Sequence, residues 1–161
     1  MAFVHLHNHT EYSLLDGATK VYDMVKRAAD LGMPAVAITD HGVMSGVPEL
    51  ADACDKVKAE TGTWVKPIFG CEIYFTTDSS LKKEGKQKLH HMILLAKNNT
   101  GYHNIVKLVS ESHVDNFYYR PRTTFEMLEK YSEGVIATSA CIAGIIPRCV
   151  DAGKIDEAIE W

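Results

Sequence analysis

The hydrophobic and polar positions along the chain switch repeatedly between strand-like and helix-like spacing. A continuous apolar run at 34–39 predicts a strand that is buried on both faces. Other strands are predicted at 3–9, 67–75, 89–96 and 135–139, and helices at 21–31, 46–61, 100–113, 124–133 and 143–152. Strands that alternate with helices and are buried on both faces indicate an α/β protein with parallel strands, either a barrel or an open doubly wound sheet.

Polar residues and glycines mark the expected ends of several helices. Thr19 and Thr100 are predicted N-caps, and Thr123 forms a capping box with Glu126. Gly62 is expected to end the helix at 46–61.

Two further segments are a polar loop and a helix that lacks a signal for its C-terminal end. Residues 78–88 are lysine-rich and predict a loop, whereas 155–161 predict a helix that has no C-terminal glycine or proline. We therefore expect the chain to be a truncated part of a longer domain.

Composition limits the class of protein. With 161 residues and 46% hydrophobic residues, the chain is long enough for one core. It contains no apolar run of the roughly 20 residues that a membrane span needs, and no secretory signal, so a cytoplasmic protein without a membrane partner is expected. Its four cysteines show no C-x-x-C pair, which predicts free thiols.

The net charge of −4 argues against tight, independent binding of DNA, because such binding needs clustered cations. This charge does not exclude a reaction on nucleic acid that is bound by another domain or subunit. Bound divalent metals would also add positive charge that the formal count ignores.

Three histidines at alternate positions, His5, His7 and His9, are the most informative chemical feature. In an extended strand such residues point to one face, so their imidazoles would lie close together. Neutral imidazole is a common ligand of zinc, iron and manganese. The alternative is a histidine-rich surface edge.

Further metal-ligand types recur where predicted strands end, at His41, Glu72, His91 and Cys141. The carboxyl ends of parallel strands gather around one site, so these residues are expected to be neighbours in space. Three of them also have a plain structural interpretation: His41 as a loop residue after an Asp40 cap, Glu72 as part of a buried salt bridge, and Cys141 as a core thiol. His90 and His91 face opposite ways in a strand, so only one of them should belong to the site.

Several motifs together resemble the PHP (polymerase and histidinol phosphatase) domain, and most closely the form at the N-terminus of the alpha subunit of bacterial DNA polymerase III. They lie in order at 5–17, 38–42, 67–74, 91–97, 100–104, 117–122 and 139–142. The resemblance implies a distorted (β/α)7 barrel, of which residues 1–161 would be the incomplete N-terminal part. The remaining strands and an Asp-x-His pair of ligands would lie beyond Trp161.

The resemblance also implies a metal centre with up to three divalent ions (zinc, manganese or iron). Its ligands in this chain would be His7, His9, Asp16, His41, Glu72, His91 and Cys141. Among them, Glu72, His9 and His41 would be catalytic, with Glu72 bridging two ions, and His5 would lie beside the site.

The function implied is metal-dependent hydrolysis of phosphodiesters, with a 3′–5′ proofreading exonuclease role in a DNA-directed DNA polymerase. That parent would contact DNA and other replisome subunits, and the present residues alone would be inactive. Two alternatives are a structural, metal-stapled domain that docks a separate exonuclease, and a free-standing phosphoesterase such as histidinol phosphatase. Arg120 and Arg122 either contact a DNA phosphate or anchor their own loop.

Overall fold

The computed structural model describes residues 3–78, 80 and 88–161, so most of the loop predicted at 78–88 lies outside the described residues. The chain divides into two compact units, residues 1–71 and residues 72–161. Strand β2 (Lys66–Phe75) contributes residues to both units.

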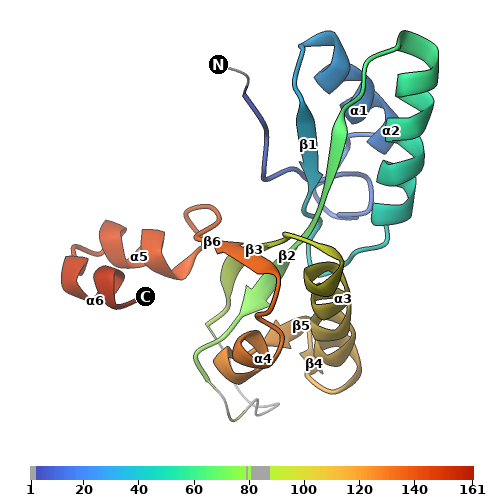
Figure 1. Cartoon of the computed structure of the whole chain (residues 1–161). Coiled ribbons are helices and arrows are strands. Elements are labelled where there is room, and N and C mark those ends of the chain that lie inside the picture. Colours follow the sequence, from blue (N-terminus) through green and yellow to red (C-terminus); the bar gives the residue numbers. More distant parts are fainter. Residues whose placement is uncertain (1–2, 79, 81–87) are drawn as a thin grey trace. The chain divides into compact units, whose positions relative to one another are not determined.

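The first unit contains two helices and a parallel pair of strands. Strand β1 (Ala35–Ile38) pairs in parallel with β2, from Ala35 opposite Lys66 to Ile38 opposite Phe69. Helices α1 (Val21–Asp30) and α2 (Val47–Thr61) lie side by side (Figure 1). All four residues of β1 are buried, as the apolar run at 34–39 predicts.

The segment before α1 corrects the first predicted strand. Residues 3–9 form no regular strand, although two backbone amides of the β1 region bond to them: Ala37 N donates to His5 O at 3.1 Å and Thr39 N to Asn8 O at 3.0 Å. The Asn8 side-chain amide donates to Ala37 O at 3.0 Å. The Asn8 side chain thus takes the place of a backbone N–H as the donor to Ala37 O. This interrupts the backbone hydrogen-bond ladder that the alternation of residues predicts.

The second unit is built around strands in the order β4-β5-β2-β3-β6. Beyond β2, its strands are β3 (His90–Ala96), β4 (Phe117–Tyr118), β5 (Arg120–Thr123) and β6 (Val135–Thr138). Its helices are α3 (Asn99–Val114), α4 (Phe125–Lys130), α5 (Ile145–Asp151) and α6 (Ile155–Glu160).

Not all strand pairs of this unit are parallel, in contrast to the parallel strands that the predicted α/β arrangement suggested. Strands β2 and β5 are parallel, but β3 and β6 are antiparallel, and β4 with β5 forms a hairpin that the pattern did not predict. Tyr119 turns this hairpin with φ of 58°. A strand of two residues such as β4 is too short to show alternation, and β-branched residues do not mark it.

The glycine prediction is confirmed, whereas the three threonine caps are wrong. Gly62 ends α2 in the left-handed region, with φ of 74°. Helix α1 starts after Lys20 without a side-chain cap, and the cap of α3 is Asn98, which accepts a hydrogen bond from Gly101 N at 3.0 Å. Thr123 belongs to β5, and α4 starts after Thr124. An N-cap residue has an extended backbone conformation just before the first helical turn. Tertiary packing decides which polar residue adopts this conformation.

None of the helices in the described residues is long and apolar enough to cross a membrane. The alternation of helices and strands confirms the α/β class.

Candidate functional site

The seven predicted metal ligands fall into two clusters, one in each unit. The first-unit cluster consists of His7, His9, Asp16 and His41. The second-unit cluster consists of Glu72, His91 and Cys141.

The first-unit cluster centres on the ring of His9. Its Nε2 lies 3.1 Å from Nε2 of His7, and its plane stacks on His41 with ring centroids 4.1 Å apart. Two imidazoles on one tetrahedral zinc ion, with Zn–N bonds of about 2.0–2.1 Å, place their nitrogens about 3.3 Å apart. The His7 and His9 nitrogens therefore fit a shared metal ion.

Asp16 contacts the ring edge of His41. Its Oδ2 is 2.9 Å from Nε2 of His41, which is a hydrogen-bonding distance. A carboxylate in this position orients an imidazole that binds metal.

The buried carboxylate of Asp40, which the sequence suggested only as a cap, holds this cluster together. Asp40 accepts hydrogen bonds from Thr10 N at 2.6 Å, from Thr10 Oγ1 at 2.8 Å and from Ser13 Oγ at 2.8 Å. Buried carboxylates need such donors to offset the cost of desolvation. The signal in the sequence was the polar pair Asp40-His41 directly after a buried strand.

Ser13 links Asp40 to His9. Because the single Ser13 hydroxyl proton goes to Asp40, Ser13 Oγ is left to accept hydrogen bonds from His41 N at 3.2 Å and from His9 Nδ1 at 3.3 Å. The proton of a neutral His9 is then on Nδ1, and its Nε2 lone pair faces His7. This is the tautomer that a metal ion at Nε2 requires.

The second-unit cluster joins two neighbouring strands and the loop after β6. Glu72 is 1% exposed and forms an ion pair with His91 Nδ1. The exposed Cys141 places Sγ 3.7 Å from the same nitrogen. A thiolate and an imidazole on one tetrahedral zinc ion, with bonds of about 2.3 and 2.0–2.1 Å, lie about 3.6 Å apart. The His91 nitrogen and the Cys141 sulfur therefore have the spacing of two ligands of one ion.

The PHP domain family model matches residues 5–161 of this chain. The chain belongs to the PHP domain family. This membership confirms the expected resemblance and, with the observed elements, the expected fold class.

Curated relatives of this PHP domain are named DNA polymerase III subunit alpha. The protein of Borreliella burgdorferi is 46% identical over 160 residues, which are 97% of this chain and 13% of that protein. The protein of Aquifex aeolicus is 41% identical over 167 residues, covering 99% of this chain and 14% of that protein. The chain thus spans about one-eighth of the length of these relatives.

Among solved structures, an amidohydrolase from Chromobacterium violaceum with bound sulfate and no metal is 20% identical. The match covers 68% of this chain and 33% of that chain, with a TM-score of 0.47.

The two adjacent histidines of β3 have different surroundings in this PHP domain. His91 belongs to the second-unit cluster, whereas His90 is buried beside Arg148, whose Nη1 lies 3.4 Å from His90 Nδ1. Burial, together with the charges of Arg148 and Lys88, lowers the pKa of His90 to about 4. The prediction that only one histidine of the pair belongs to the cluster agrees with this arrangement.

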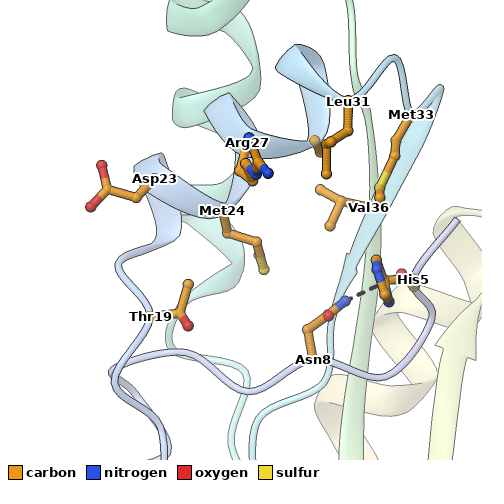
Figure 2. Close-up of a pocket in the computed structure, with 10 residues that line it drawn as sticks. His5, Asn8, Thr19, Asp23, Met24, Arg27, Leu31, Met33 and Val36 are labelled. Atoms are coloured by element: carbon orange, nitrogen blue, oxygen red, sulfur yellow. Dashed lines mark hydrogen bonds between the residues drawn. The ribbon is translucent and has the colours of Figure 1, made fainter.

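His5 lines a pocket of about 240 Å³ within the first unit. Figure 2 shows Met24, Leu31, Met33 and Val36 around this pocket, with His5 at its edge. Its ring contacts Phe3 edge-on. The expectation that His5 lies beside the metal site stays a prediction.

The two arginines of β5 make contacts within the second unit. Arg122 is buried, donates from Nε to Asn116 O at 2.9 Å and lies over the Tyr118 ring. Arg120 is exposed and lies 5.4 Å from the centre of the Tyr74 ring. These contacts favour the loop-anchoring interpretation of Arg122, while Arg120 keeps an accessible guanidinium.

Proposed function

We propose that this PHP domain hydrolyses phosphodiesters with the help of divalent metal ions. The observation that carries the proposal is the Ser13 hydrogen bond to His9, which leaves the His9 Nε2 lone pair directed toward His7. The proposed ligands are those of the first-unit and second-unit clusters, and the proposed ions are zinc, manganese or iron, up to three in the complete domain. Bound ions would lower the pKa of a water molecule and stabilise the charge of a scissile phosphate.

The chain's own residues have distinct roles in this proposal. His9 and His41 hold metal in fixed ring orientations, because one is tied to Ser13 and the other to Asp16. Glu72 supplies a buried negative charge that a cation compensates, and Cys141 adds a soft ligand next to His91.

The similarity to alpha subunits of DNA polymerase III supports a place for this domain in a replicative DNA-directed DNA polymerase. On this proposal the substrate is the 3′ end of DNA and the activity is a 3′–5′ proofreading exonuclease. DNA and other replisome subunits would be its partners, and the cytoplasm its compartment. The same relatives disfavour a free-standing histidinol phosphatase.

A structural role is the second candidate. The second-unit cluster joins β2, β3 and the loop after β6, so a metal ion there would cross-link three segments. Such a metal-stapled domain would support the polymerase and dock a separate exonuclease.

The experiment uses the full-length protein that contains this domain, with a primer carrying a mispaired 3′ end and either zinc or manganese. We expect primer degradation that falls by at least about 100-fold in His9→Ala and in Glu72→Ala. His103→Ala, on α3, is the matched histidine control and should retain activity. If wild type and the two ligand variants degrade the primer equally, or not at all, the exonuclease proposal fails. Metal bound by an inactive wild type would then favour the structural role.

A further inference from the structure

A short turn beside the first-unit cluster presents two leucines to solvent. Leu14 is 88% exposed and Leu15 is 83% exposed. The next residue, Asp16, contacts His41. Exposed single apolar residues are common, but two adjacent leucines held next to a cluster of metal ligands form a local apolar surface.

Hydrogen bonds fix the conformation of this turn. Ser13 N donates to Thr10 O at 2.8 Å, while Asp16 N and Gly17 N both donate to Ser13 O, at 3.0 and 2.8 Å. The Ser13 side chain is bound to the buried Asp40. The leucines are therefore carried by an ordered backbone.

Close packing at Gly17 holds the other end of the turn. A Cβ at this position would lie 1.8 Å from Thr10 O, so only glycine allows the two backbones to approach this closely. The turn consequently directs Leu14 and Leu15 outward while it keeps Asp16 against His41.

We propose that Leu14 and Leu15 contact the sugar and base of the nucleotide whose phosphodiester binds at the first-unit cluster. This inference rests on the proposed function and deepens it, because it makes the two leucines specificity residues for nucleotides over small phosphate esters. The sugar is bonded to the phosphate and carries the base, so both must lie near the ligands that hold the phosphate. Apolar side chains pack against the face of an unpaired base, and because every base has such a face, the contact does not depend on sequence.

The test compares two diesters that share the p-nitrophenolate leaving group, thymidine 5′-(p-nitrophenyl phosphate) and methyl p-nitrophenyl phosphate. The protein is the full-length parent, and the variant is Leu14→Ser combined with Leu15→Ser. We expect KM for the thymidine ester to rise about tenfold with little change in kcat. The kcat/KM for the methyl ester should not change. Val114→Ser, at an 80% exposed position on α3, is the control and should leave both esters unaffected.

Two results would overturn the inference. Equal losses on both esters, with a lower melting temperature, would show that the leucines pack against another part of the protein. Unchanged kinetics on both esters would show that nothing in the substrate contacts them.

Binding measurements separate this inference from the proposed function. If wild type hydrolyses neither ester, the hydrolytic function fails, and calorimetry with thymidine 5′-monophosphate and methyl phosphate on the manganese-loaded protein decides the inference. Tighter binding of the thymidine nucleotide that is lost in the leucine variant supports it. Equal affinities of wild type and variant refute it.

Discussion

The imidazole of His9 stacks on the imidazole of His41, with centroids 4.1 Å apart and 15° between the ring planes. One residue precedes the first helix and the other follows strand β1. Ser13 contacts both, through His9 Nδ1 and the backbone amide of His41. Protein contacts therefore hold the rings of the first-unit cluster in place, which reduces the ordering cost of binding a ligand.

The first prediction concerns Asp40, whose buried carboxylate accepts three hydrogen bonds. Asp40→Ala leaves Thr10 N and two hydroxyl donors without their acceptor, so we expect the free energy of unfolding to fall by about 3 kcal/mol. Urea denaturation measures this change. Asp30→Ala, at an exposed position on α1, should cost less than about 1 kcal/mol. Equal effects of the two substitutions would contradict the central role of Asp40.

The second prediction concerns Ser13 and the tautomer of His9. Ser13→Ala removes the acceptor for His9 Nδ1, so the proton is no longer held away from Nε2. We expect zinc affinity, measured by competition with a chelator, to fall about tenfold. Ser110→Ala removes a hydroxyl that bonds only within α3 among the contacts described, and should leave zinc affinity unchanged. An unaltered affinity in Ser13→Ala would refute the proposed tautomer.

The third prediction concerns close packing at Gly17. In Gly17→Ala the new Cβ meets Thr10 O, so the turn must move and Asp16 shifts from His41. We expect a stability loss of about 2 kcal/mol together with weaker zinc binding. Gly32→Ala has open space around its Cβ but a φ of 67°, so it should cost about 1 kcal/mol without affecting zinc. Calorimetric melting and zinc titration test both variants.

The fourth prediction concerns the reactivity of the cysteines. Burial raises the pKa of the Cys54 thiol to about 11, so at pH 8 almost none of it is the reactive thiolate. Its reactivity should increase only as the pH approaches that value. Cys141 is exposed and should be alkylated first in the native protein, and bound zinc should slow this reaction by at least about tenfold.

Mass spectrometry of peptides after alkylation, with and without zinc, identifies the modified cysteines. Cys149 serves as a buried control in the same unit. Alkylation of Cys141 at the same rate with and without zinc would exclude it as a ligand.

Many helices and strands could be predicted from the sequence because they depend on residues that are close together in the chain. The apolar run at 34–39 predicted buried β1, and Gly62 predicted the end of α2. The hairpin of β4 and β5 escaped prediction, because β4 has only two residues and the turn depends on a positive φ at Tyr119. The antiparallel pairing of β3 with β6 was also missed, since strand direction is not encoded in the alternation of one strand.

By itself, the sequence determined the candidate ligands, because residues such as His7, Glu72 and Cys141 have donor atoms whatever the fold. Their order and spacing also indicated the family. Only the tertiary structure decided which donors are held together and how. It showed that His90 is buried whereas His91 lies next to Cys141. It also showed that Ser13, bound to Asp40, fixes the His9 tautomer, and that Leu14 is exposed. The reason is physical: hydrogen bonds and burial depend on residues that are distant in sequence, whereas donor chemistry belongs to each residue alone.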